Sequence, residues 1–358
     1  MRKYYTRPCN FYYGNYSKHL VKKGKTLPLA GNSNISFDHL EILKRKNIRN
    51  TESNIYPISK IKKLTKVIQS VVKKDLKNIV SKRKSVSGIQ FNKPHIMGIL
   101  NMTPDSFSDG GLFFSESKAY HQANLMIKNG ASIIDIGGES TRPGSKTINN
   151  KREWNRIKNV IKKIKKKSLK IVLSLDTRKS EVMKKGIEYG VDIINDVSGL
   201  NFDKKSFDVI KSKNTPFILH HMQGTPDIMQ KKPIYKDAIL DVYDFFEKKI
   251  NFCLKKKYTK ELIIVDPGIG FGKNLNHNLR IMSKISLLHS LGCPIMIGTS
   301  KKRFIEHIVT KFDTPDRTGG TLASVLHGLS HGVQLFRVHN VKEINQGILV
   351  FNKILNTN

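Results

Sequence analysis

The sequence predicts an α/β protein, a (β/α)8 barrel of the TIM type with a small basic N-terminal extension. From residue 95 onward, short apolar and β-branched runs alternate with stretches of helical periodicity, which is typical of a parallel sheet covered by helices. Eight such runs over about 265 residues favour a closed barrel over an open sheet. The 358 residues also exceed the roughly 250 of one barrel, so an additional segment is expected.

Each predicted strand is a short apolar run that ends in polar or glycine-rich residues. The eight runs are HIMGIL (95–100), IIDIGG (133–138), IVLSLDT (171–177), IINDVS (193–198), PFILHHM (216–222), IIVDPG (263–268), PIMIGTS (294–300) and VQLFRVHN (333–340). Helices are predicted between them, for example over 119–130, which ends at a glycine, and over 152–167, which carries one apolar stripe. We assign residues 91–358 to the barrel domain.

Residues 1–90 differ from the barrel in charge. Residues 1–94 hold 22 Lys and Arg against four Asp and Glu, which is half of the chain's formal charge of +36. Aromatic residues gather near the start, and residues 64–80 carry apolar residues at helical spacing. We therefore predict a small N-terminal unit that ends in a helix and is joined to the barrel by a linker at 82–88. Its role is left open.

The high positive charge would suit a nucleic-acid-binding protein. However, Lys, Asn and Ile are frequent along the whole chain, including on predicted helix faces, so the charge is interpreted mainly as a feature of composition. It implies a surface that attracts anionic substrates, and no nucleic-acid partner is expected.

Cysteine usage and hydropathy indicate the compartment. Cys9, Cys253 and Cys293 form no CxxC pair, which argues against a disulfide framework or a zinc ribbon. No apolar run approaches the roughly 20 residues of a membrane span, and the first residues lack the apolar core of a signal peptide. We expect a cytoplasmic protein without a membrane partner, although residues 1–37, which contain no acid, leave an organelle presequence open.

In a barrel of this type the active site lies at the carboxyl ends of the strands. Every predicted strand ends there in a polar or ionisable residue, namely Asn101, Asp135, Asp176, Asn195, His221, Asp266, Ser300, and Arg337 with His339. One such residue often only caps the next helix, but eight together favour a functional rim. Two long glycine-rich loops, 101–114 and 137–150, flank the rim, and Thr141, Arg142 and Ser145 suit anion capture. We therefore expect a phosphorylated substrate.

Two motifs fail on inspection. Gly268, Gly270 and Gly272 precede Lys273, but neither the P-loop pattern nor the dinucleotide fingerprint is satisfied. His327 and His331 are four residues apart without a third ligand nearby, so helix packing is favoured over zinc binding.

Eight segments together resemble the dihydropteroate synthase family in order and spacing. They are MGILNMTPDSFSDGG (97–111), IIDIGGESTRPGS (133–145), DTRKSEV (176–182), INDVSG (194–199), HMQGTP (221–226), DPGIGFGK (266–273), GTSKKRF (298–304) and FRVHNV (336–341). The resemblance covers about residues 92–345. It implies a (β/α)8 barrel with a deep pterin pocket, usually a homodimer. It also implies a transferase of folate biosynthesis that joins 6-hydroxymethyl-7,8-dihydropterin diphosphate to p-aminobenzoate, giving 7,8-dihydropteroate and diphosphate.

The resemblance also implies roles for individual residues. The pterin would be held by Asp176, Asn195, Asp266 and Lys302, with Met222 and Gly298 also in its pocket. The diphosphate would be held by Asn101, Thr141, Arg142, Arg337 and His339, with Mg2+ reached through Asn101. The p-aminobenzoate pocket would contain Thr141, Arg142, Pro143, Phe271 and Ser300. Catalysis would rest on Asn101, Asp176, Lys302, Arg337 and His339, and it would proceed by positioning rather than through a covalent enzyme intermediate.

Some positions depart from the family's common pattern. Lys301 stands where Arg is common, Arg178 and Ser180 stand where Ser and Pro are frequent, and Met102 replaces a usual Val. These changes bear on fine specificity rather than on the reaction. Residues 4–42 resemble an N-terminal extension found in some bacterial members.

Two other functions compete with this interpretation. A corrinoid-dependent methyltransferase acting on methyltetrahydrofolate would share the barrel and the pterin pocket but should lack the two loop motifs. A basic RNA- or DNA-binding protein that has lost catalysis would account for the charge of residues 1–94, and steeply salt-dependent binding would reveal it.

Overall fold

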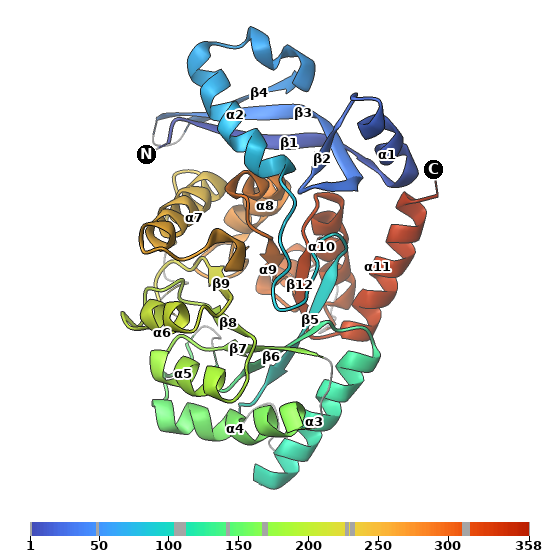
Figure 1. Ribbon diagram of the computed structural model, residues 1–358. Coiled ribbons are helices and arrows are strands. Elements are labelled where there is room, and N and C mark those ends of the chain that lie inside the picture. Colours follow the sequence, from blue (N-terminus) through green and yellow to red (C-terminus); the bar gives the residue numbers. More distant parts are fainter. Residues whose placement is uncertain are drawn as a thin grey trace.

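Eight parallel strands form the central sheet (Figure 1). The computed structural model describes residues 2–47, 50–103, 112–140, 144–166, 171–225, 229, 233–309 and 316–357. The strands are β5 (His95–Asn101), β6 (Ile133–Gly137), β7 (Val172–Asp176), β8 (Ile193–Asp196), β9 (Phe217–His220), β10 (Ile263–Asp266), β11 (Met296–Ile297) and β12 (Leu335–Val338). Their order is β10-β9-β8-β7-β6-β5-β12-β11, and a parallel bridge between Val265 and Ile295 joins the two ends. The predicted (β/α)8 barrel is confirmed.

Helices cover the outside of this sheet. They are α3 (Leu112–Lys128), α4 (Asn150–Lys166), α5 (Ser180–Glu188), α6 (Ser206–Ser212), α7 (Ala238–Lys255), α8 (Leu275–Ser283), α9 (Arg303–Ile308), α10 (Thr318–Ser330) and α11 (Val341–Leu355), with short 3-10 turns η3 (Lys260–Leu262) and η4 (Ile285–Leu291). The predicted stripe on α4 is buried, because Trp154, Ile157, Ile161 and Ile164 all pack into the main core. No described helix is long and apolar enough to cross a bilayer.

The amino-terminal end of the barrel is closed by residues 86–91. Val86 and Ile89 pair as a short antiparallel bridge, and they pack with Phe91 against the first residues of the strands, such as Ile133 and Leu335. Within the stretch 82–88, which we predicted to be a linker, Arg83 and Val86 are buried and the other residues are exposed. This closure leaves the carboxyl ends of the strands as the open face of the barrel.

Residues 2–80 form a second layer of structure beside the barrel (Figure 1). Its antiparallel sheet contains β1 (Tyr4–Tyr13), β2 (Leu27–Leu29), β3 (Asn32–Asn47) and β4 (Asn50–Pro57), with β3 pairing all the others. Helices α1 (Gly14–Lys22) and α2 (Lys66–Val80) and the turn η1 (Ile58–Lys63) complete it. Helix α2 agrees with the predicted helix over 64–80, and the sheet was not predicted.

This N-terminal layer shares its core with the barrel at α7. Tyr5 is fully buried, its ring lies edge-on to Tyr243 at 5.4 Å, and its hydroxyl donates to Asp244 at 2.8 Å. Arg45 pairs with Asp244 at 3.1 Å and with Asp241 at 2.8 Å. Apolar packing and partly buried ion pairs together attach the sheet to the flank of the barrel.

We expect Tyr5→Ala to destabilise the whole protein rather than the N-terminal layer alone. Truncating a buried aromatic side chain costs about 3–5 kcal/mol, and here the lost contacts lie between the two parts. Tyr16→Ala is the matched control, because Tyr16 is 51% exposed and its loss should cost about 1 kcal/mol or less. Chemical unfolding measures both. Equal effects of the two substitutions would contradict a shared core.

Candidate active site

Polar side chains converge at the carboxyl ends of the barrel strands. Strand register places Asp176 of β7 opposite Asn195 of β8 and opposite Gly137 of β6. Asn101 ends β5, Asp266 ends β10, and Arg337 lies in β12. Because all eight strands are parallel, these residues share one end of the barrel, as the sequence predicted.

A buried guanidinium lies at the centre of this rim. Arg337 donates from Nε to Asp135 Oδ2 at 2.6 Å and from Nη2 to Asp176 Oδ2 at 2.7 Å. Asp135 also accepts a hydrogen bond from Ser174 Oγ at 2.6 Å. Burial raises the pKa of Asp176 to about 7, against the opposing effect of Arg337. One cation is thus shared between two buried carboxylates.

Asn195 is oriented by the same carboxylate. Its Nδ2 donates to Asp135 Oδ2 at 3.0 Å, which leaves Oδ1 buried with no hydrogen-bond partner in the described structure. An unsatisfied buried acceptor costs roughly 1–3 kcal/mol, so such a group is usually completed by a ligand or water. The site therefore offers an acceptor for an N–H donor at this point.

Asp266 and Lys302 form the other side of the site. Asp266 Oδ1 accepts from the backbone N–H of Gly268 at 2.7 Å, and burial raises the pKa of Asp266 to about 6. Lys302 Nζ lies 3.9 Å from the centroid of the Phe271 ring. Burial, with the nearby Arg337, lowers the pKa of Lys302 to about 8. Both groups can change protonation state near neutral pH.

Small and apolar residues shape the space between these groups. Phe271 packs with Met222 and Met229 in a separate apolar cluster. A Cβ atom added to Gly298 would lie 3.8 Å from Arg337 Cβ and 4.0 Å from Asp266 Oδ2, which places this glycine between the two charged residues. The site thus combines an apolar wall with charged groups on its other sides.

Ser300 and His339 form a pair at the edge of the rim. The Ser300 hydroxyl lies 3.0 Å from His339 Nδ1, and the backbone N–H of His339 donates to the same hydroxyl at 3.2 Å. Asn101, at the end of β5, is partly exposed. Thr141, Arg142 and Pro143 lie outside the described residues, as do residues 104–111 of the first long loop.

Some chemistry-bearing residues have structural roles instead. Lys273 Nζ donates to the carbonyls of Gly268 and Phe271, each at 2.9 Å, and lies 2.9 Å from His221 Nδ1. Lys273 therefore stabilises the glycine-rich turn that precedes it. The predicted packing role of His327 is confirmed, because its Nε2 contacts the Met282 carbonyl at 2.9 Å.

The sequence placed Asp135 on the rim but gave it no role. The structure makes it the acceptor for Ser174, Asn195 and Arg337. The sequence held one indication of polar contacts below the rim. Ser174 and Asp176 are two residues apart in a predicted strand, so both side chains face the same side of that strand. Among the described residues, no group of three or more His, Cys, Asp and Glu could hold a metal ion.

The fold and site define a pterin-binding barrel enzyme. The model of the pterin binding enzyme family matches residues 97–339. The dihydropteroate synthase of Synechocystis sp. is 39% identical over 254 residues, 71% of this chain and 88% of that protein. The dihydropteroate synthase of Escherichia coli is 37% identical over 269 residues, 75% of this chain and 94% of that protein.

Solved structures agree with these relatives. Yersinia pestis dihydropteroate synthase, in a sulfonamide drug complex, superposes with a TM-score of 0.71 at 34% identity, covering 76% of this chain and 98% of that one. Xanthomonas albilineans dihydropteroate synthase, in complex with 7,8-dihydropteroate, gives 0.67 at 30% identity, covering 75% and 97%. The chain belongs to the dihydropteroate synthases, within the family of pterin-binding enzymes.

The lowered pKa of Lys302 predicts a pH-dependent cost in stability. A base whose pKa is depressed on folding is destabilising while it is charged, and this cost disappears as pH rises from about 8 in the folded state towards 10.5. We expect Lys302→Met to raise the Tm at pH 7, with a gain that shrinks towards pH 10. Lys184→Met, at an exposed position of α5, is the control. A gain independent of pH would contradict the burial argument.

Proposed function

We propose that this chain condenses 6-hydroxymethyl-7,8-dihydropterin diphosphate with p-aminobenzoate, forming 7,8-dihydropteroate and diphosphate in folate biosynthesis. The observation that carries the proposal is the set of buried acids, amide and cations at the carboxyl end of a barrel that belongs to this family. Acceptors for a pterin edge and cations for a diphosphate lie in one site.

The pterin binds to Asp176, Asn195, Asp266 and Lys302 in this proposal, with Met222 and Gly298 beside it. A pterin edge presents an amino group next to a ring N–H, and a carboxylate accepts such a pair with both oxygens. The unpartnered Oδ1 of Asn195 accepts a further N–H, while the Lys302 ammonium donates to a ring acceptor. Each buried polar atom then gains the partner that its burial requires.

Arg337 changes its partners on pterin binding in this proposal. Its Nη2 donates to Asp176 Oδ2, and although this oxygen can accept two hydrogen bonds, the pterin takes the place of the guanidinium there. The bond from Nε to Asp135 can persist, because Asp135 lies on a different strand. In this proposal the released N–H groups turn to the diphosphate. Pterin binding thus prepares the cation that stabilises the leaving group.

The leaving diphosphate is held by Asn101, Arg337 and His339, together with Thr141 and Arg142. Cations and N–H donors aimed at the departing oxygens lower the activation barrier for cleavage of the C–O bond. The methylene cation that results is stabilised by the electron-rich pterin. The site must exclude water until the amine of p-aminobenzoate attacks this carbon and loses a proton. No enzyme side chain forms a covalent bond in this sequence.

Asn101 is proposed as the protein ligand for Mg2+. This ion prefers oxygen ligands and is commonly held by few protein groups together with substrate phosphates. The Asn101 amide supplies one oxygen at the end of β5, and the described residues hold no larger ligand cluster. This donor set fits an ion that arrives with the diphosphate. When bound, the ion would neutralise part of the negative charge of the diphosphate.

The p-aminobenzoate pocket is assigned to Thr141, Arg142, Pro143, Phe271 and Ser300. Phe271 presents a ring beside Lys302, and Ser300 lies next to His339 on the diphosphate side. A benzoate held against the ring of Phe271 would bring its amine close to the pterin carbon.

Assembly and compartment are proposed from two further observations. Helix α11 exposes Leu349, Val350 and Ile354 by 61%, 57% and 63%, an apolar surface that supports a homodimer and that sedimentation can test. The three cysteines are buried as free thiols, which supports a cytoplasmic location. Residues 1–90 are proposed as an accessory extension to the catalytic barrel of 91–358.

The direct test is diphosphate release from the pterin diphosphate, with and without p-aminobenzoate, while dihydropteroate is followed by mass. We expect both release and product to require p-aminobenzoate and Mg2+, and EDTA to abolish both. Tight pterin binding without product would instead indicate a pterin-binding relative that has lost the condensation.

Asp176→Ala should abolish turnover through lost pterin binding. Removing the paired acceptor should lower the affinity for the pterin diphosphate at least about 100-fold. Asp192→Ala is the matched control, since Asp192 pairs with Lys165 just before β8, at the opposite end of that strand from the rim. Calorimetry measures both affinities, and an unchanged affinity in Asp176→Ala would refute the assignment.

A further inference from the structure

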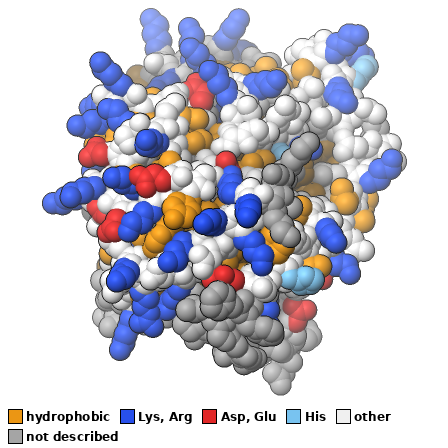
Figure 2. All heavy atoms as spheres, turned by 60° about the horizontal axis from the view of Figure 1, so that its bottom comes forward, with side chains coloured by type: hydrophobic (Ala, Val, Ile, Leu, Met, Phe, Trp, Pro, Cys, Tyr) orange, Lys and Arg blue, Asp and Glu red, His pale blue; other side chains and the backbone are white. Residues whose placement is uncertain are grey.

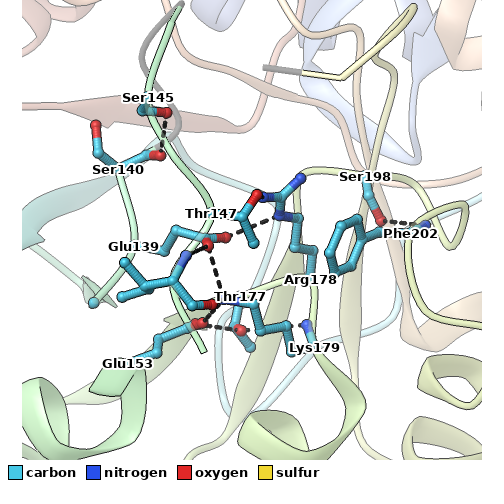
Figure 3. A network of polar contacts seen from close by, with 12 residues as sticks. Glu139, Ser140, Ser145, Thr147, Glu153, Thr177, Arg178, Lys179, Ser198 and Phe202 are labelled. Atoms are coloured by element: carbon cyan, nitrogen blue, oxygen red, sulfur yellow. Dashed lines mark hydrogen bonds and ion pairs between the residues drawn. The ribbon is translucent and has the colours of Figure 1, made fainter. Parts of the chain in front are cut away.

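A buried ionic cluster joins the two ends of the second long loop, between β6 and α4. Glu139 comes from the first end of this loop and Glu153 from the first turn of α4, while Arg178 and Lys179 follow β7 (Figure 3). All four side chains are buried, with exposures of 8%, 0%, 4% and 4%. The cluster balances two acids with two bases, so each buried charge has an opposite partner.

Lys179 ties the cluster to the framework of the barrel. Its Nζ donates to Glu139 at 2.7 Å, to Glu153 at 2.6 Å and to the carbonyl of Ile148 at 2.7 Å. Glu153 also accepts from the Thr177 hydroxyl at 2.5 Å. With its three acceptors, Lys179 links Glu139, Ile148 and Glu153, and its replacement would leave two buried carboxylates short of a partner.

Arg178 is different, because both of its hydrogen bonds reach the loop. Its Nε donates to Glu139 Oε2 at 2.8 Å, and its Nη2 donates to the Thr147 hydroxyl at 2.9 Å. The guanidinium also lies over the ring of Phe202, 4.0 Å from the centroid. One planar group therefore bridges residues 139 and 147, while the aromatic ring fixes its plane.

The bridge joins the loop to the strand that carries the pterin carboxylate. Arg178 is two residues after Asp176, so its backbone is held by β7. Glu139 Oε1 in turn accepts from the backbone N–H of Ile148 at 3.0 Å, and Ser145 Oγ donates to the carbonyl of Ser140 at 2.6 Å. The two described ends of the loop are thus fixed to each other and to β7.

We propose that Arg178 is a positioning residue for p-aminobenzoate, which ties Glu139 and Thr147, at the two described ends of the second loop, to the end of β7 without touching the substrate. This inference rests on the proposed function, which assigns contacts with p-aminobenzoate and with the diphosphate to this loop. The bridge from Arg178 constrains the loop at both Glu139 and Thr147. Its effect should fall on p-aminobenzoate and on the diphosphate but not on the pterin ring, because no hydrogen bond of Arg178 reaches a proposed ligand of the pterin ring.

The test compares Arg178→Ser, Arg178→Lys and a control in the full-length protein. We expect Arg178→Ser to raise the KM for p-aminobenzoate about 10-fold and to lower the affinity for the pterin diphosphate, with the affinity for 6-hydroxymethyl-7,8-dihydropterin, which lacks the diphosphate, within about twofold of the parent. Arg178→Lys should lie between, because one ammonium can pair with Glu139 but lacks the second arm to Thr147. Lys185→Ala, which removes a surface ion pair with Glu181 on α5, should leave all three quantities unchanged.

A second readout separates this inference from the proposed function. Hydrogen exchange over residues 144–149 should be faster in Arg178→Ser than in the parent and the Lys185→Ala control. An unchanged KM, or an affinity for 6-hydroxymethyl-7,8-dihydropterin that falls in step with that for p-aminobenzoate, would overturn the positioning role. If the parent protein makes no dihydropteroate, the proposed function fails; faster exchange would then show a loop bridge that serves another ligand, and the p-aminobenzoate assignment would be withdrawn.

Discussion

Asp135 is fully buried inside a closed barrel, where an unpaired carboxylate would be strongly destabilising. Its partner, Arg337, comes from β12, so the ion pair spans β5, which lies between β6 and β12. The same carboxylate fixes the amide of Asn195, and the same guanidinium restrains Asp176. The geometry of the site therefore depends on this one ion pair, which orders its polar groups before a substrate arrives.

The opposite end of the barrel shows the complementary constraint. There the strands begin with apolar residues, and Val86, Ile89 and Phe91 close the opening. The adjoining N-terminal sheet packs on the flank at α7 instead of over the rim. Among the described residues, the amino end of the barrel is thus closed by apolar packing, and the polar groups of the site lie at the carboxyl ends.

Much of this could be predicted from the sequence, for a physical reason. Barrel strands are buried on both faces and read as continuous apolar runs, so β10 begins at the residue where its run begins. The N-terminal sheet gave no such signal, because its strands mix aromatic residues with lysines and pair across long separations, as Tyr5 does with Leu43. Pairings within the site were hidden for the same reason: Asp135 and Arg337 are 202 residues apart.

The structure shows that the basic residues of the N-terminal layer occupy two different environments. Arg2, Arg7 and Arg45 turn inward and pair with acids, Arg7 with Glu41 and Arg2 with Asp75. The lysines of the described residues up to 94 are exposed, except for Lys44, which is partly buried. A buried guanidinium can make several hydrogen bonds, whereas an ammonium is more strongly hydrated. The arginines are therefore buried or partly buried beside acids, and the lysines face water.

Lys and Arg side chains are scattered over the face in Figure 2 rather than gathered in one groove. On that face the positive charge is therefore spread out and attracts anions in general, and such attraction would favour the approach of a diphosphate substrate.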